Sequence, residues 1–231
     1  ADPGAATVTV TCTYSWGQCP FDQVPIPAGA TPNAGSDGVL VVLHGDLAYE
    51  LWQAKSDNSS WTASWGAVNN ISSVDGWGWG GSATGSGASR AAGVVRVAEI
   101  EAGVIDHALV VQTDTVCADV VRTPAIKTDG DSQRSDCIPE GARIQLDPSI
   151  DLDTIAGLTR GERAVAEALQ VYGAYVIDRG GSPMSISFER AADASGSYPG
   201  EVYSDAGFRW DYDGMPDIPW SKMRVLANWD S

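Results

Sequence analysis

GVVRVAEIEAGVIDHALVVQ, residues 93–112, contains two runs rich in β-branched residues, Val94–Ile100 and Val104–Val111, on either side of Ala102-Gly103. β-branched residues favour strands, and a glycine between two such runs favours a turn. The stretch therefore predicts a β-hairpin, around which we expect the rest of the chain to be organised. Its second run carries His107, one of the 2 histidines in the protein.

Three carboxylates lie close to His107 in the sequence: Glu99, Glu101 and Asp106. Glu99 and Glu101 have the same parity, so both would point to one face of a regular strand. An imidazole near carboxylates can transfer protons, bind a metal ion or form a structural pair. The stretch locates a candidate site without deciding its chemistry.

The composition excludes several classes of partner. The 231 residues carry a net charge of −16 with no Lys/Arg cluster to offset it, which argues against nucleic acid and anionic membranes. No apolar run approaches the ~20 residues that span a bilayer. With 43% hydrophobic and 19% charged residues, the chain has the composition of a folded globular protein, and we expect one domain over residues 1–231.

The 4 cysteines form two local pairs, Cys12 with Cys19 and Cys117 with Cys137. Each pair brackets a turn-rich loop, so we expect these two disulfides among the three connectivities. Zinc is the alternative, but the chain has no Cys-x2-Cys and no histidine near a cysteine in sequence. Disulfides, and a chain that begins Ala-Asp-Pro without Met, indicate a secreted protein.

Short strand patterns separated by Gly- and Pro-rich turns follow one another along the chain. An N-terminal strand leads into an extended Pro/Gly-rich arm that ends near residue 37, and Val39–Leu43 and Leu47–Ala54 predict a hairpin that turns at Gly45-Asp46. Such a succession of strands is typical of an all-β fold, and we expect a single-domain β-sandwich of jelly-roll type.

One helix is expected in this β-sandwich. Thr159 is a suitable N-cap and Glu162 completes a capping box, after which apolar residues repeat at helical spacing. The pattern predicts a helix from Arg160 to about Tyr172 that packs on a sheet.

Glu50, on the return strand of the 39–54 hairpin, joins Glu99 and His107 as a candidate catalytic group. Two carboxylates beside a groove suit a glycoside hydrolase, whereas a His or Tyr base with an Arg suits a polysaccharide lyase. The alternative is that both glutamates are solvated strand residues and the histidine is structural. The residues expected to bind substrate are Asp46, Tyr49, Trp77, Trp79, Arg143 and Asp178.

The glycine-rich segment Asp75–Gly87 precedes the 93–112 stretch. A phosphate cradle needs a helix N-terminus and usually a lysine, and neither follows, so nucleotide binding is not expected. The segment reads either as the rim of a groove, where Trp77 and Trp79 stack on sugar, or as a tightly packed Ω-loop.

Calcium is the one cofactor that the sequence leaves open. Asp129–Gln133 and Asp211–Gly214 both place oxygen ligands at alternating positions. Neither segment continues to the glutamate that an EF-hand loop requires at its twelfth position, and Asp-Gly pairs are common in turns. Calcium is therefore not assigned, and no other cofactor is expected.

Several motifs together resemble a family of secreted proteins from actinobacteria and other soil microbes whose members are named only as hypothetical. They are Tyr49–Trp52, Ala83–Gly87, Ile105–Leu109, Pro124-Ala125 and Tyr172–Tyr175 with Asp178. The resemblance implies secretion and a shared polar site, and it brings no established activity.

These observations predict a secreted carbohydrate-active protein. The first hypothesis is an enzyme that cleaves a neutral or weakly charged polysaccharide with Glu50, Glu99 and His107 in one groove. The alternative is a non-catalytic protein that binds glycan, coats a surface or assembles with itself. Carboxylates that are buried and mutually paired would favour the alternative.

Overall fold

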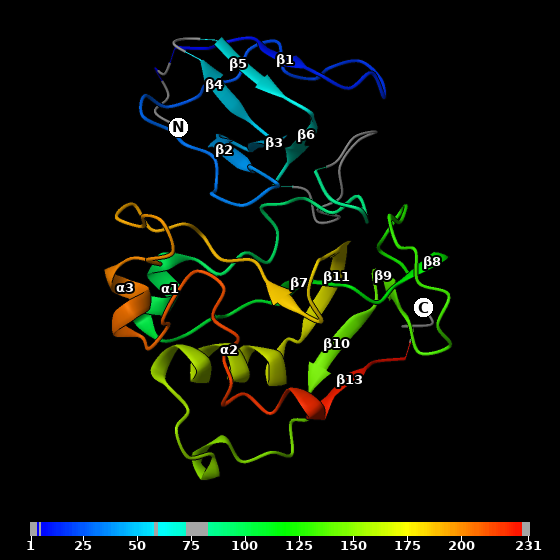
Figure 1. The fold of residues 1–231 in the computed structure, drawn as a ribbon, viewed down its shortest axis with the longest axis vertical. Coiled ribbons are helices and arrows are strands. Elements are labelled where there is room, and N and C mark those ends of the chain that lie inside the picture. Colours follow the sequence, from blue (N-terminus) through cyan, green and yellow to red (C-terminus); the bar gives the residue numbers. More distant parts are fainter. Residues whose placement is uncertain (1–3, 5, 58–59, 73–82, 228–231) are drawn as a thin grey trace. The chain divides into compact units, whose positions relative to one another are not determined.

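The computed structural model describes residue 4 and residues 6–57, 60–72 and 83–227 (Figure 1). The chain divides into two compact units. Unit 1 comprises residues 1–92 and 124–127, and unit 2 comprises residues 93–123 and 128–231. Within the described residues most regular structure is strand, arranged in several sheets, so the predicted all-β class is confirmed. That residues 1–231 behave as one domain stays a prediction.

Unit 1 contains two three-stranded sheets. One has the order β1 (Val10–Cys12), β5 (Ser60–Ala63), β4 (Lys55–Asp57), and the other has the order β2 (Leu40–His44), β3 (Leu47–Trp52), β6 (Trp65–Asn70). Buried side chains of both sheets, Val10 and Trp61 from one and Val42 and Leu51 from the other, share one hydrophobic core. Unit 1 is therefore a small β-sandwich. The predicted hairpin at Gly45-Asp46 is confirmed.

Unit 2 is built on a five-stranded sheet with the order β12-β7-β11-β10-β13, in which β7 and β11 run parallel. Its strands are β7 (Leu109–Thr113), β10 (Arg143–Leu146), β11 (Ala174–Arg179), β12 (Ser185–Ile186) and β13 (Met223–Val225). A second, parallel pair consists of β8 (Val116–Val121) and β9 (Ile138–Glu140). The helices are α1 (Val97–Ala102), α2 (Arg160–Val171) and α3 (Glu201–Asp205), with short 3-10 turns at Leu152–Thr154 and Trp220–Lys222.

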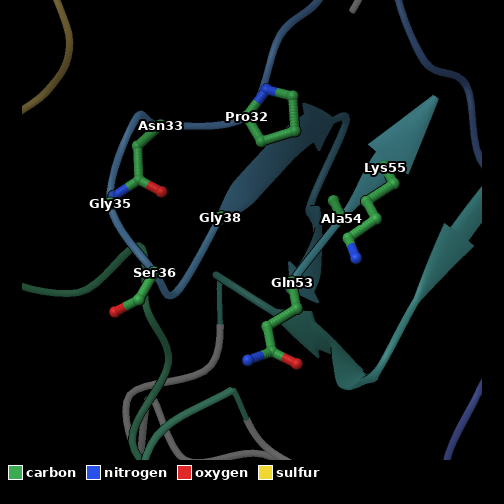
Figure 2. A pocket seen from close by; sticks show the side chains of 8 residues that line it. All are labelled: Pro32, Asn33, Gly35, Ser36, Gly38, Gln53, Ala54 and Lys55. Atoms are coloured by element: carbon green, nitrogen blue, oxygen red, sulfur yellow. The ribbon is translucent and has the colours of Figure 1, made fainter.

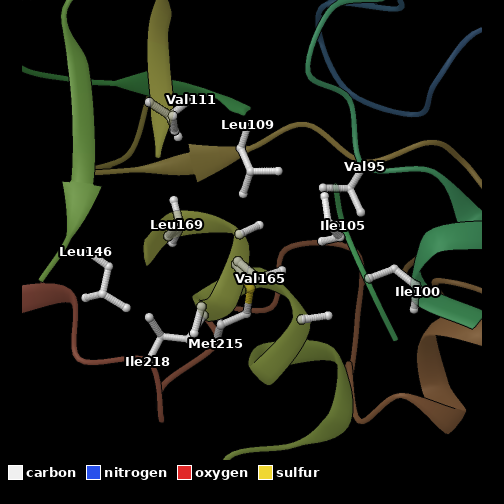
Figure 3. Close-up of a cluster of buried hydrophobic side chains, with 14 of the residues drawn as sticks. Val95, Ile100, Ile105, Leu109, Val111, Leu146, Val165, Leu169, Met215 and Ile218 are labelled. Carbon is white, nitrogen blue, oxygen red and sulfur yellow. The ribbon is translucent and has the colours of Figure 1, made fainter. Parts of the chain in front are cut away.

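The predicted helix near residues 160–172 is confirmed as α2. Thr159 accepts a hydrogen bond from the Glu162 amide, and the Glu162 side chain bonds back to the Thr159 amide, which completes the capping box. The apolar stripe of α2 is buried: Val165 and Leu169 point toward Leu109 and Leu146 of the sheet (Figure 3). This packing makes α2 part of the core of unit 2.

The hairpin predicted over residues 94–111 is wrong. Val97–Ala102 forms helix α1, and the second strand begins only at Leu109. The Glu99 side chain accepts a hydrogen bond from the Arg96 amide at the helix start, and Gly103 ends the helix in the left-handed conformation at φ 74°. A capping side chain and a glycine C-cap thus outweigh the strand preference of the Val/Ile run.

Both predicted disulfides, Cys12–Cys19 and Cys117–Cys137, are confirmed. Each closes a loop within one unit, the first in unit 1 and the second in unit 2. Among the described residues, no helix has the length and apolar character needed to cross a membrane.

Candidate functional site

The three predicted catalytic residues are divided between the units. Glu50 lies on β3 of unit 1, whereas Glu99 lies on α1 and His107 in the loop before β7, both in unit 2. Strand β3 pairs with β2 and β6, and β7 pairs with β11 and β12. The expectation that His107 lies on a strand is wrong, because β7 begins only at Leu109.

The Glu50 carboxyl is fully buried, with 0% of the residue exposed. The Ser89 hydroxyl donates a short hydrogen bond to one of its oxygens, and the Arg90 amide donates to the other at 2.9 Å. Burial raises the pKa of Glu50, and the hydrogen bonds from Arg90 and Ser89 oppose that shift in part. Glu50 thus holds the loop that contains Ser89 and Arg90 against β3.

That loop is the second half of the glycine-rich segment, and it is packed. Residues 83–89 are all buried. The Thr84 hydroxyl donates to Ala88 O at 2.8 Å, and Lys127 Nζ donates to Thr84 O at 2.6 Å. This half matches the Ω-loop interpretation. Trp77 and Trp79, the expected sugar-stacking residues, lie outside the described residues.

Glu99 and His107 form a pair in unit 2. His107 Nε2 lies 3.1 Å from Glu99 Oε1, and His107 Nδ1 lies 2.9 Å from Ala108 O. Glu99 also caps α1 through the Arg96 amide at 2.7 Å. The pair corresponds to the structural alternative of the sequence analysis.

The other predicted substrate-binding residues have separate surroundings. Asp46 lies in the exposed turn between β2 and β3, and Tyr49 packs half-buried against the core of unit 1. In unit 2, Arg143 Nε donates to Tyr172 O at 2.7 Å and so caps the carboxyl end of α2. Asp178 is buried on β11.

Three aromatic residues missed by the sequence analysis form an exposed stack in unit 1. The rings of Tyr14 and Trp16 lie 4.6 Å apart at 16°, and those of Trp16 and Trp52 lie 6.2 Å apart at 19°. Trp16 is 66% exposed and Tyr14 is 45% exposed. We call Tyr14, Trp16 and Trp52 the aromatic platform. Large aromatic groups are rarely left this open without a partner.

A disulfide, a backbone hydrogen bond and a buried tryptophan fix the position of the aromatic platform. Tyr14 and Trp16 belong to the loop that the Cys12–Cys19 disulfide closes. The Tyr14 amide donates to Ser64 O at 3.1 Å, and the buried Trp65 supports Trp16 edge-on at 6.0 Å. The pairing of Tyr-Ser-Trp with a bracketing disulfide was the sequence signal that could have identified this surface.

A shallow polar hollow of about 390 Å³ lies in unit 1 and includes Gln53, the residue after Trp52 (Figure 2). Its lining is Pro32, Asn33, Gly35, Ser36, Gly38, Gln53, Ala54 and Lys55. Trp52 Nε1 donates to Asp37 Oδ1 at 3.3 Å, which ties the ring to the segment that forms the hollow. Gln53 has a φ of 52°, a conformation that residues other than glycine seldom adopt and that often marks functional positions.

A third group of side chains, in unit 2, consists of Asp129, Glu140 and Asp178. One carboxylate oxygen of each lies within 4.8 Å of the others. Burial raises the pKa of Glu140 to about 8, the nearby Thr128 hydroxyl opposes the shift, and the charges of Asp129 and Asp178 add to it. Asp178 thus lies in an all-carboxylate cluster.

No family model matches the chain, and no match was found among the curated proteins or the solved structures. The resemblance to secreted hypothetical proteins therefore stays a prediction, and the function rests on the geometry of these groups.

Proposed function

We propose that this protein is a secreted, non-catalytic glycan-binding protein whose aromatic platform stacks on sugar rings. The observation that carries the proposal is the near-parallel arrangement of Tyr14, Trp16 and Trp52 with Trp16 66% exposed. A pyranose presents a face of C–H groups that packs against a flat aromatic ring, and its hydroxyls need polar partners at the edge of that ring.

The hollow beside Trp52 supplies polar groups of the required kind. Asn33, Ser36 and Gln53 line it with amide and hydroxyl groups (Figure 2). Gln53 Oε1 accepts from Ser64 Oγ at 2.6 Å, which fixes the orientation of the amide. A ring surface next to fixed donors and acceptors is the usual composition of a small-ligand site.

Pre-organisation favours binding on this surface. The disulfide Cys12–Cys19 and the backbone hydrogen bond from Tyr14 to Ser64 hold the loop that carries Tyr14 and Trp16 before any ligand arrives. Rigid binding residues lose little conformational entropy when a ligand binds, so a larger share of the contact energy appears as affinity. The disulfides also support an oxidising, extracellular location.

The candidate catalytic groups favour binding over cleavage. Glu50 is 0% exposed and bonded to Ser89 and Arg90, and Glu99 is engaged with His107 and the α1 amide. A glycosidase needs two carboxyl groups facing an open groove. The net charge of −16 further favours a neutral glycan over a polyanionic one.

The test is a panel of neutral polysaccharides, such as cellulose, chitin, xylan and mixed-linkage glucans, measured by pull-down and affinity electrophoresis. Trp16→Ala removes the most exposed ring and should weaken binding by about 5- to 30-fold, equivalent to about 1–2 kcal/mol for one stacked ring. Trp210→Ala is the matched control, because Trp210 is 46% exposed and belongs to unit 2. Equal losses in both variants would contradict the proposal.

Cleavage is measured on the same panel through reducing ends and through the absorbance of unsaturated products. We expect neither to rise. Product formation that Glu50→Gln abolishes, in a variant that remains folded, would replace the proposal with the enzymatic hypothesis.

A further inference from the structure

The acidic cluster (Asp129, Glu140 and Asp178) brings together three separate segments of unit 2. Glu140 ends β9, Asp178 lies on β11, and Asp129 belongs to the loop that the Cys117–Cys137 disulfide closes. Strands β9 and β11 lie side by side (Figure 1). Carboxylates gathered this closely repel one another unless a positive charge lies among them.

The local backbone places each carboxylate in the cluster. The pairing of β11 with β7 shifts register between Val176 and Asp178, and such an irregularity re-aims the side chains of a strand. Next to Asp129, Gly130 packs so closely on β8 that a Cβ there would lie 2.3 Å from Cys117 O. Only glycine allows this approach, which holds the Asp129 loop against the strands.

Glu140 provides an observation that is independent of the clustering. The residue is 0% exposed. Its Oε2 accepts a hydrogen bond from the Asp129 amide at 3.3 Å, but its Oε1 is buried and has no hydrogen-bond partner in the described part of the chain. Buried polar atoms nearly always have a partner, and an atom that lacks one within the protein is a candidate to bind water or an ion.

The side chain of Arg179, the residue after Asp178, pairs outside the cluster. Arg179 Nη2 lies 2.9 Å from Asp131 Oδ2, outside the cluster. Only the backbone of Arg179 serves the cluster, since its amide donates to Asp129 Oδ1 at 3.0 Å. That bond fixes the Asp129 carboxylate and leaves its second oxygen for another partner.

We propose that Asp129, Glu140 and Asp178 bind one Ca²⁺ ion. All three donors are carboxylate oxygens, which are the ligands of hard cations. Oxygens that share one Ca²⁺ lie at most about 4.6–5.2 Å apart, twice the metal–oxygen distance, whereas those that share one Mg²⁺ lie at most about 4.2 Å apart. The oxygens of the cluster lie within 4.8 Å of one another, as the ligands of one Ca²⁺ ion do. Asp129 is exposed, so water molecules can complete the coordination.

Isothermal titration of the full-length, EDTA-dialysed protein with CaCl₂ tests the proposal. Parallel titrations use MgCl₂ and MnCl₂, and all contain NaCl at one fixed ionic strength, so that screening of the charge of −16 is constant. We expect one Ca²⁺ per chain, bound more tightly than Mg²⁺ or Mn²⁺. The absence of a binding signal, or tighter binding of either other ion, would overturn the assignment.

Three variants locate the ion. Glu140→Gln and Asp129→Asn each remove one charged ligand and should weaken Ca²⁺ binding by more than about tenfold, the lower end of what changes around a metal site cost. Asp131→Asn is the matched control, because Asp131 is exposed, lies in the same loop and pairs with Arg179 outside the cluster. Its affinity should equal that of the wild type.

Asp129→Asn keeps the test decisive if Glu140→Gln does not fold. Asp129 is exposed, and asparagine retains the oxygen that accepts from the Arg179 amide. Undiminished Ca²⁺ binding in a folded Asp129→Asn or Glu140→Gln variant would refute the site.

Discussion

Two glutamates of this protein, Glu50 in unit 1 and Glu140 in unit 2, are equally buried but have opposite surroundings. Each is 0% exposed. Glu50 has one oxygen bonded to the Ser89 hydroxyl and the other to the Arg90 amide. Glu140 has an Oε1 without a hydrogen-bond partner among the described residues, and it lies beside the carboxylates of Asp129 and Asp178.

The difference in hydrogen-bond partners indicates that the Glu50 carboxyl is structural and that the Glu140 carboxyl binds a ligand. Burial costs free energy for both, but donors from the protein offset that cost for Glu50. At Glu140 the neighbouring carboxylates are acceptors and increase the cost, which the proposed Ca²⁺ ion would offset. Burial alone therefore does not identify a functional carboxyl, whereas the balance of donors and acceptors around it does.

The largest effect is expected for Glu50→Ala. Removal of the carboxyl takes away the acceptor of the Ser89 hydroxyl and of the Arg90 amide. The loss of an acceptor costs about 1–3 kcal/mol for each of the two donors, so the free energy of unfolding should fall by about 2–6 kcal/mol. Urea denaturation followed by tryptophan fluorescence measures the change. A loss below about 0.5 kcal/mol, the level of an ordinary surface substitution, would remove Glu50 from its structural role.

A smaller effect of opposite sign is expected for Glu140→Gln in EDTA. Glutamine supplies an N–H₂ group that can donate to the neighbouring carboxylates of Asp129 and Asp178. The free energy of unfolding should rise by about 1–3 kcal/mol, the cost of one unsatisfied buried polar group. Asp131→Asn, measured alongside, should stay within about 0.5 kcal/mol of the wild type. A destabilised Glu140→Gln would mean that the carboxyl is satisfied by the protein itself.

The smallest effect is a pH dependence at Glu50. Burial raises its pKa above the ordinary value of 4.5, so the folded state holds this proton more tightly than the unfolded chain. The contribution of Glu50 to stability is then complete below pH 4.5 and decreases as pH rises above it. The stability difference between wild type and Glu50→Gln should decline by up to about 1.4 kcal/mol per pH unit. Parallel stability curves from urea denaturation across this pH range would contradict the raised pKa.

The sequence predicted the features that depend on neighbouring residues. The Gly45-Asp46 hairpin, the helix capped by Thr159 and Glu162, and both disulfides rest on signals a few residues long or on short loop closure. The helix α1 was misread as a strand because its Val/Ile content outweighed its capping signals. Its N-cap is Arg96, which is not one of the residues by which a helix start is usually recognised.

The candidate sites were harder to predict, because their residues meet only in the folded chain. The burial of Glu50 comes from Arg90, 40 residues later in the sequence. The acidic cluster combines a strand end, a strand irregularity and a disulfide loop, and no local pattern specifies that combination. The aromatic platform could be predicted in part. Tyr14 and Trp16 share one short loop, but Trp52 lies on a strand distant in the sequence and contacts Trp16 only in the folded chain.

The most direct test compares the Ca²⁺-dependent shift in the unfolding midpoint of three proteins: wild type, Glu50→Gln and Glu140→Gln. A ligand that binds only the folded state stabilises it by about 2.7 kcal/mol at a concentration of 100 times Kd. Wild type and Glu50→Gln should therefore melt several degrees higher in CaCl₂ than in EDTA, whereas Glu140→Gln should melt at the same temperature in both. An equal shift in Glu140→Gln, or a shift lost in a folded Glu50→Gln, would contradict the division of these two glutamates into ligand and structural support.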